Sequence, residues 1–231
     1  MRCRRGAVVS AVLMIAVLCL ALPGCGTKTS QDTQPTKQKE STAMSAPSSS
    51  PQSSPGARLG PDGKPLKTLA DFPNDQDGAS VEAVIKTGKG DIVMQLYPDS
   101  APISVANFLH LAREGFYNGT SFHRVVPGFV VQGGDPASKD PANTNAGTGE
   151  PFYNMPAEFS SRKHETGTVA MARRSDSPDS NGSQFYICLT PQPSLDGQYT
   201  VFGQVVSGMD VVQQIQQGDV MNEVIIRPKS S

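Results

Sequence analysis

From residue 80 onward, the apolar residues of this 231-residue chain fall into short runs, and this pattern limits the folds open to it. Each run is rich in Val, Ile, Phe or Tyr and ends near Gly, Pro, Asn or Asp. Such runs are typical of β-strands joined by turns. They read VEAVI and DIVMQLY around a Lys86–Asp91 turn, then SFHRVV, FVVQGG, GTVAMAR, SQFYICL, TVFGQV and NEVIIRP. The pattern predicts a mainly β domain, either a closed barrel or a sandwich.

Two other stretches have helical spacing. Apolar residues between Ala101 and Glu114 recur every three or four positions, and Gly115 follows as a stop signal. A second helix is expected from Gly208 to Gln217. The roughly 150 residues of this region are enough for a sizeable core.

The N-terminus has the form of an export signal. Arg2, Arg4 and Arg5 precede an uncharged apolar run of 16 residues, 7–22, which is shorter than the roughly 20 residues of a membrane-spanning helix. The run ends in Leu22-Pro23-Gly24-Cys25, which resembles a bacterial lipoprotein signal. That resemblance implies removal of residues 1–24 and acylation of Cys25, which would hold the protein on a membrane. An ordinary cleaved signal and an uncleaved anchor are the alternatives.

A polar, low-complexity segment follows this signal. Ser, Thr, Pro, Gln and Gly supply 27 of the 40 residues from 26 to 65, and Met44 and Leu59 are the only large apolar residues there. Such a segment buries too little surface to offset its ordering entropy. We expect residues 25–79 to form a disordered tether, with 66–78 as a transition. A domain at 80–228 and a tail at 229–231 complete the chain.

The overall composition is the average of these unlike parts. A hydrophobic fraction of 37% argues against a polytopic membrane protein, and a net charge of −1 gives no reason to expect nucleic acid as a partner. The three His residues show no metal-binding spacing, so neither metal nor cofactor is expected. Nothing indicates an assembly surface, and a monomer is the default.

The most informative stretch is FHRVVPGFVVQGGD, residues 122–135. Alternation in a strand places Val130 and Gln132 on one face and Phe129 and Val131 on the other. The Pro127-Gly128 turn lets the ends of two strands converge, so one patch can combine a cation, an amide and apolar groups. In NGSQFYI (181–187), Gln184 and Tyr186 share a face in the same way, and Phe185 and Ile187 point to the core.

These two motifs, followed by LDGQYTVFG (195–203), resemble the cyclophilin family of peptidyl-prolyl cis–trans isomerases. The resemblance covers roughly residues 80–228. It implies an eight-stranded antiparallel β-barrel capped by two α-helices, with a groove on its outer face that binds Xaa-Pro segments of polypeptides.

The resemblance also assigns candidate site residues. Arg124 matches the catalytic arginine of the family. The matching substrate-binding positions are Phe129, Val130, Gln132, Ala172, Arg173, Gln184, Tyr186, Leu195 and Tyr199. Val130 is often Met in the family and Tyr186 commonly Phe. Arg173 falls where many members have Asn, at a position that acts largely through its backbone, and Tyr199 where many eukaryotic members have His.

Two departures from the family pattern carry consequences. Ser194 lies near the position of a Trp in cyclosporin-sensitive members, and the chain has no Trp, so weak cyclosporin binding is expected. The loop 174–180 is two residues longer than the common eukaryotic pattern, which puts its match in doubt.

The remaining reactive residues are expected to be structural. Isomerisation transfers no proton, so His123 is interpreted as a structural or rim residue, His110 as helix surface and His164 as loop. Cys188 lies in an apolar strand and is expected to be a buried, inert thiol.

The sequence therefore predicts an exported, lipid-anchored prolyl isomerase that faces the periplasm or the exterior and assists the folding of exported proteins. The alternative is a non-catalytic chaperone module that binds Pro-containing peptides. A purely structural envelope lipoprotein is a weaker third possibility.

Overall fold

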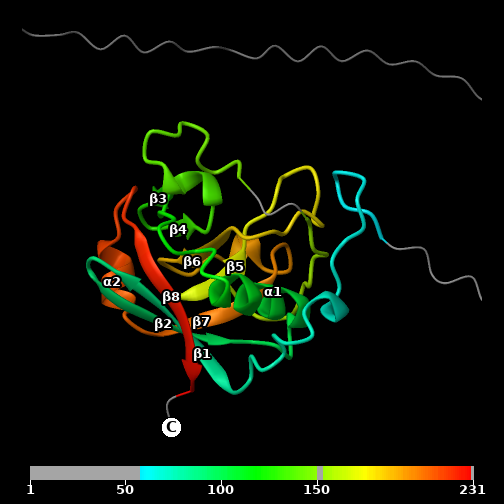
Figure 1. Cartoon of the computed structure of the whole chain (residues 1–231). Coiled ribbons are helices and arrows are strands. Elements are labelled where there is room, and N and C mark those ends of the chain that lie inside the picture. The colour runs from blue at the N-terminus through cyan, green and yellow to red at the C-terminus, as the bar shows by residue number, and fades with distance from the viewer. Residues whose placement is uncertain (1–57, 150–152, 230–231) are drawn as a thin grey trace, which may run out of the picture. The chain divides into compact units, whose positions relative to one another are not determined.

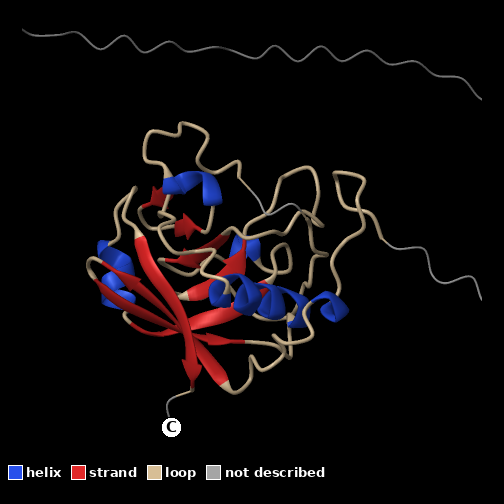
Figure 2. Cartoon of the chain, viewed as in Figure 1, coloured by secondary structure: helices blue, strands red, loops and turns tan. Residues whose placement is uncertain are grey.

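Eight strands form one antiparallel sheet in the computed structural model, which describes residues 58–149 and 153–229 (Figures 1 and 2). The strands are β1 (Val81–Thr87), β2 (Gly90–Leu96), β3 (Arg124–Val126), β4 (Val130–Gly133), β5 (Thr168–Met171), β6 (Phe185–Cys188), β7 (Val201–Ser207) and β8 (Met221–Pro228). Their spatial order is β3-β4-β6-β5-β7-β2-β1-β8. The expected mainly β fold with eight antiparallel strands is confirmed.

The sheet curls into a half-barrel, and no strand ladder joins its two edge strands, β3 and β8. Short backbone contacts connect the segments beside these edges. Ser121 forms an isolated bridge with Val220, and the Phe122 amide donates to the Asp219 carbonyl over 2.8 Å. The expected barrel is thus an open, curled sheet.

Local sequence explains the β1–β2 hairpin. Val84 pairs with Val93 and Thr87 with Gly90, which leaves Gly88 and Lys89 as the turn. Gly90 has a φ of 134°, in the region that favours glycine. The Thr87 hydroxyl donates to the Gly90 carbonyl over 2.8 Å, so the turn is fixed by its own residues.

Helix α1 (Pro102–Arg113) lies within one residue of its expected bounds at each end. Its first amides are satisfied by Glu158, a residue far away in the sequence. The Glu158 carboxylate accepts from the Ile103 amide at 2.9 Å and from the Ser104 amide at 2.8 Å. A carboxylate at a helix N-terminus is also favoured by the helix dipole.

Helix α2 (Met209–Gln214) is three residues shorter at its C-terminal end than expected. Ile215 has an extended ψ of 133°, which ends the helix. The next amide, that of Gln216, donates to the Asp219 carboxylate, and Lys89 donates to the Gln214 carbonyl. Side chains outside the helix thus supply hydrogen bonds that a further helical turn would have made.

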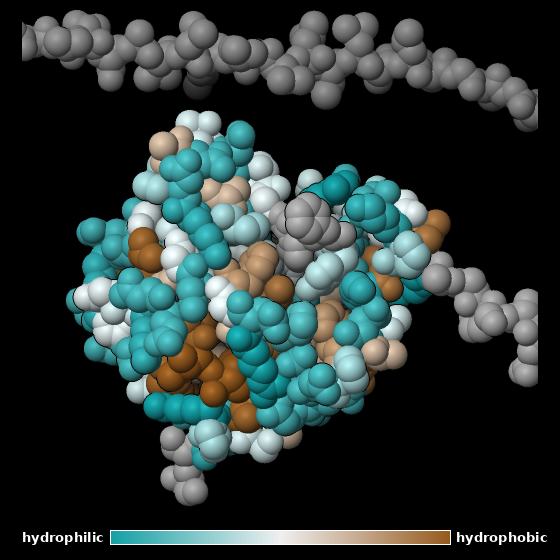
Figure 3. All heavy atoms as spheres, in the orientation of Figure 1, coloured by the Kyte–Doolittle hydropathy of each residue, from teal (hydrophilic) through white to brown (hydrophobic). Residues whose placement is uncertain are grey.

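The core lies between the concave side of the sheet and α1. Phe108 of α1 packs against three buried aromatic rings, those of Tyr117, Phe185 and Phe202, at centroid distances of 5.1 to 5.8 Å. Figure 3 shows a mostly hydrophilic surface, with apolar side chains gathered where β8 passes α1. Ile103 of α1 and Ile226 of β8 are both only partly buried.

Residues 58–79, which we expected to belong to the tether, pack against the domain. Leu66 and Phe72 are 7% and 3% exposed, and the Phe72 ring lies 5.7 Å from that of His110 on α1. Arg113 of α1 forms ion pairs with Asp75 and Asp77. We call residues 58–79 the N-terminal arm. The arm is ordered although it has few apolar residues, because Leu66 and Phe72 are buried against the domain and no separate core is required.

Within the described residues, no helix is long and apolar enough to span a membrane. The expected signal, Cys25 and most of the expected tether lie outside the described residues. Those assignments stay predictions.

Candidate active site

A surface pocket opens beside strands β4 and β6 and brings together most of the predicted site residues. Its lining consists of Arg124, Phe129, Val130, Gln132, Ala172, Arg173, Tyr186, Leu195 and Tyr199. This set contains the predicted catalytic residue and eight of the nine predicted substrate-binding residues. Their roles in binding and catalysis stay predictions.

Strand register explains why these residues meet. Arg124 of β3 pairs with Gln132 of β4, which pairs with Tyr186 of β6, which pairs with Ala170 of β5. Residues at paired positions share a face, so one row of side chains crosses four strands. Val131, Phe185 and Ile187 point to the opposite side and are buried in the core, as alternation predicts.

Phe129 is the exception to this alternation. It precedes β4, in the turn where Gly128 has a φ of 70°, and its amide donates to the Val126 carbonyl. The turn directs Phe129 to the pocket beside Val130, whereas strand alternation placed it with Val131. The match to the family motif had placed it in the pocket.

A chain of side-chain hydrogen bonds runs away from Arg124. Arg124 Nη1 donates to Gln132 Oε1 at 3.3 Å, and Gln132 Nε2 donates to Gln184 Oε1 at 3.0 Å. Gln184 Nε2 donates to the carbonyls of Gly147 and Gly149 at 3.0 and 2.8 Å. The Arg124 guanidinium also lies 5.8 Å from the Phe129 ring centroid. Arg124 is exposed, so its remaining donors are open to a ligand.

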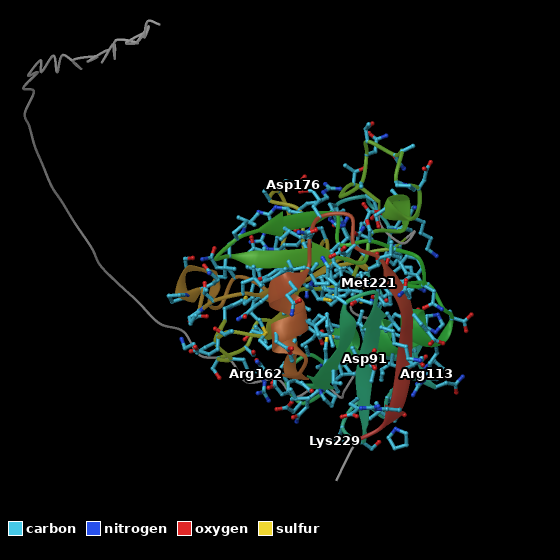
Figure 4. The ribbon with its side chains drawn as sticks, turned by 90° about the vertical axis from the view of Figure 1, so that its left-hand side faces the viewer. Asp91, Arg113, Arg162, Asp176, Met221 and Lys229 are labelled. Atoms are coloured by element: carbon cyan, nitrogen blue, oxygen red, sulfur yellow. The ribbon has the colours of Figure 1, made fainter. Side chains whose placement is uncertain are left out.

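Gln184 is the predicted binding residue that does not line this pocket. It lies in a neighbouring hollow together with Gly147, Arg174 and Gly182. Both hollows share Gln132, Ala172 and Arg173. The Gln184 side-chain amide bonds to Gln132 and to the carbonyls of Gly147 and Gly149. It therefore links β4 to the 147–149 loop. Asp176, on the loop 174–180 beyond this hollow, lies at the outer edge of the molecule (Figure 4).

Aromatic and aliphatic side chains form the rest of the pocket wall. The Tyr186 and Tyr199 rings meet edge to face at a centroid distance of 5.7 Å. Leu195 ends a short 3-10 helix, Pro193–Leu195, which also carries Ser194. These residues add apolar surface to the pocket that Arg124 also lines.

The side chain of Arg173 is fastened to its neighbours. Its guanidinium lies 4.7 Å from the Tyr199 ring centroid and donates to the carbonyls of Gln198 and Arg174. That the position acts through its backbone stays a prediction. The adjacent Ala172 amide donates to the Gln184 carbonyl at 2.9 Å.

The structure distinguishes the three histidines. His110 is partly exposed on α1, beside Asp75. His123 is partly buried, and burial lowers the pKa of its imidazole and favours its neutral form. His164, expected in a loop, does lie in one, but its side chain is fully buried behind Tyr186 and bonds to Asp196. Sequence reasoning missed His164 and Asp196 as neighbours of the pocket, because no spacing rule links them to it.

The pocket thus combines the long cationic side chain of Arg124 with apolar and aromatic lining residues. Among the described residues, no cluster of three His, Cys, Asp or Glu side chains could hold a metal ion. Cys188 is buried beneath the pocket wall, and burial raises the pKa of its thiol to about 12. Such a pocket can bind a small apolar ring through its apolar lining. Arg124 can donate hydrogen bonds to carbonyl groups next to that ring.

Sequence relatives of this chain include bacterial isomerases. It is 41% identical over 169 residues to a peptidyl-prolyl cis-trans isomerase of Helicobacter pylori, an alignment that covers 71% of this chain and 98% of the relative. It is 47% identical over 135 residues to peptidyl-prolyl cis-trans isomerase B of Bacillus subtilis, which covers 58% of this chain and 88% of that one.

Solved structures agree with this relationship. A Cryptosporidium parvum cyclophilin-type peptidyl-prolyl cis-trans isomerase matches with a TM-score of 0.57 at 27% identity, over 65% of this chain and 99% of the other. A second structure of that protein, determined in the presence of the dipeptide Ala-Pro, matches with a TM-score of 0.54 at 30% identity, with the same coverage. The family model described as cyclophilin type peptidyl-prolyl cis-trans isomerase/CLD matches residues 83–229. The chain belongs to the cyclophilin-type peptidyl-prolyl cis–trans isomerase family.

Proposed function

We propose that this peptidyl-prolyl cis–trans isomerase acts on exported polypeptides at a membrane surface, to which lipid on Cys25 attaches it. The support is the basic, apolar and Cys-terminated start of the chain, followed by a polar segment that can extend away from a bilayer. Arg124 is the proposed catalytic residue. The observation that carries this role is that the exposed Arg124 side chain lines the same pocket as the apolar wall residues.

The reaction makes and breaks no bond. Resonance gives the peptide bond a rotational barrier of about 18–20 kcal/mol, and rotation removes this resonance. The prolyl nitrogen then gains lone-pair character, and a donor aimed at it acts only in the twisted state. The Arg124 guanidinium is cationic and has several N–H donors for this nitrogen or for the proline carbonyl.

The apolar wall has a different task. Phe129, Val130, Tyr186 and Leu195 hold the proline ring while the preceding carbonyl swings past Arg124. Bringing a ten-second process to a millisecond requires about 10⁴-fold acceleration, or roughly 5.4 kcal/mol. One charge-assisted donor together with positioning is a sufficient source. The related parasite cyclophilin that was studied with Ala-Pro supports the choice of an Ala-Pro peptide as substrate.

A protease-coupled assay on an Ala-Pro peptide tests Arg124. We expect Arg124→Ala to lower kcat/KM by about 10²-fold, as for the loss of one transition-state donor. Arg58→Ala is the matched control, because the Arg58 side chain is 66% exposed and pairs with Asp179 outside the pocket. Full activity of Arg124→Ala would overturn the mechanism. Peptide binding without any turnover in the wild-type protein would favour the chaperone module instead.

Membrane attachment needs a separate experiment. We expect the full chain, produced in a bacterial host, to fractionate with membranes and to incorporate labelled fatty acid. Cys25→Ser should abolish the label, because serine has no thiol to acylate. Membrane association of the wild-type protein without label would instead identify an uncleaved anchor. A soluble, unlabelled wild-type protein would identify an ordinary cleaved signal.

A further inference from the structure

A buried hydrogen-bonded chain lies directly behind the pocket wall. His164 Nε2 is 3.1 Å from the Tyr186 hydroxyl, and His164 Nδ1 is 3.1 Å from Asp196 Oδ1. The His164 side chain has no exposed surface and does not line the pocket. We propose that His164 and Asp196 are positioning residues that hold Tyr186 in the proline pocket. This inference rests on the proposed role of Tyr186 in binding the proline ring.

The charges at this chain fix the direction of its hydrogen bonds. The backbone amide of His164 and the nearby Lys163 ammonium keep the pKa of Asp196 low, at about 2, so its carboxylate is ionised at neutral pH and only accepts. His164 Nδ1 must therefore carry a hydrogen. In a neutral imidazole, Nε2 is then the acceptor, and the Tyr186 hydroxyl donates to it.

This direction has a consequence for the pocket. The Tyr186 hydrogen is committed to His164, so it cannot bond to a substrate carbonyl, and the pocket receives mainly the ring of Tyr186. Burial raises the pKa of the Tyr186 hydroxyl, which keeps that hydrogen in place. The donor that the proposed mechanism aims at the twisted peptide is then Arg124 and not the Tyr186 hydroxyl.

Ring contacts extend the effect to a second wall residue. The His164 ring is nearly parallel to that of Tyr186, at 16° and 6.1 Å, and is edge to face with Tyr199 at 6.4 Å. Tyr199 is in turn covered by Arg173 at 4.7 Å. One imidazole thus contacts the back of two aromatic residues that line the pocket. Family members with Phe at the Tyr186 position have no hydroxyl through which such an arrangement could act.

The expected kinetic effect is on KM. The wall contacts the proline ring in both the planar and the twisted states, and loss of such uniform binding raises KM without lowering kcat. Loss of one net hydrogen bond corresponds to about 2- to 10-fold. We expect His164→Ala and Tyr186→Phe each to raise KM by that factor, while kcat stays within about twofold.

A double-mutant cycle separates positioning from mere stability. If His164 acts through the Tyr186 hydroxyl, the double variant should have the KM of either single variant. Independent effects would multiply the two KM increases and overturn the proposal. A variant that is only less stable loses active molecules and therefore apparent kcat, but not KM. His110→Ala is the matched control, because His110 lies on α1 and does not line the pocket.

Nitrogen-15 NMR of the imidazole tests the wild-type protein without any substitution. We expect a hydrogen on His164 Nδ1, which faces Asp196, and none on Nε2, which faces the Tyr186 hydroxyl. A hydrogen on Nε2 alone, or on both nitrogens, would contradict the assigned direction and overturn the proposal. The proposed isomerase function fails in a different way, by absence of turnover in the wild-type protein.

Discussion

At the scale of single residues, two glutamines connect the proposed catalytic arginine to the rest of the fold. Gln132 accepts from Arg124 and donates to Gln184, which donates to the loop carbonyls of Gly147 and Gly149. Arg124 is a long, flexible side chain, and holding it in one geometry costs entropy. A fixed acceptor lowers that cost during substrate binding.

Truncation of Gln184 tests this chain. Gln184→Ala removes the acceptor of Gln132 and the donor to the 147–149 loop, so we expect kcat/KM to fall by about 3- to 10-fold, less than for Arg124→Ala. The measurement is the protease-coupled assay. Gln204→Ala is the control, because Gln204 of β7 donates to the Thr166 carbonyl and does not line the pocket. Equal losses in both variants would refute a specific role for the chain.

Cys188 tests burial beneath the pocket. Its side chain is fully buried, and burial raises its pKa to about 12, so the reactive thiolate is scarce at neutral pH. We expect iodoacetamide to modify Cys188 only in urea, as followed by mass spectrometry of the Cys188 peptide. Rapid modification of the native protein would show that the wall behind Tyr186 opens frequently.

Ser194 tests the expected weak binding of cyclosporin. The residue lies on the 3-10 helix Pro193–Leu195, beside the pocket residue Leu195. An indole at this position would add apolar surface and one N–H donor to the rim. We expect Ser194→Trp to tighten cyclosporin binding by at least about tenfold in a calorimetric titration. An unchanged affinity would mean that other rim residues limit binding.

At the scale of elements, the N-terminal arm is ordered although the polar composition of this segment predicted disorder. Phe72 inserts between His110 of α1 and Tyr153, with ring centroids 5.7 and 6.4 Å away. Replacement of a buried Phe by Ala costs about 3–5 kcal/mol in unfolding free energy. We expect Phe72→Ala to approach the lower end of this range in urea unfolding, with KM unchanged.

Leu59→Ala is the matched control for the arm, because Leu59 is 60% exposed. Its expected effect on the free energy of unfolding is below about 0.5 kcal/mol. If Phe72→Ala is equally silent, the arm does not contribute to the stability of the domain in solution.

These elements also show what a single sequence can predict. The β1–β2 hairpin and the row across β3, β4 and β6 follow from alternation and turn residues, which are local signals. The cap of α1 depends on contacts of Glu158 with Ile103 and Ser104, which precede it by 55 and 54 positions. No local sequence pattern encodes such contacts. The same holds for the arm and for the contact of His164 with Tyr186. Leu195 and Tyr199 could be predicted as pocket residues only because they match a family motif. Their spacing in the sequence does not indicate that they line the pocket.

At the scale of the whole molecule, several ionisable groups link the stability of the fold to acid pH. The pKa of Asp196 is lowered by the backbone amide of His164, that of Asp71 by the backbone amide of Thr68, and that of Asp99 by Arg162. Each of these carboxylates contributes stability above its unfolded pKa, near 3.9. That contribution is lost as pH falls through the lower folded pKa, which is about 2 for Asp196.

His123 also contributes stability that is lost on acidification, but at a higher pH than the aspartates. Burial lowers its pKa below the ordinary value near 6.5, so the unfolded chain binds the proton first. Stability contributed by the neutral imidazole is complete above pH 6.5 and declines as pH falls through the folded pKa. The aspartates and His123 therefore all predict a protein that loses stability in acid.

Urea unfolding between pH 8 and pH 3 tests this linkage. We expect the midpoint to decline first below about pH 6.5 and again below about pH 4. His123→Gln should remove part of the first decline, since glutamine does not titrate, and Asp196→Asn should remove part of the second. Because each difference between variant and wild type must shrink as pH falls below the corresponding unfolded pKa, a constant difference across the range would show that the residue acts through packing and not through its charge.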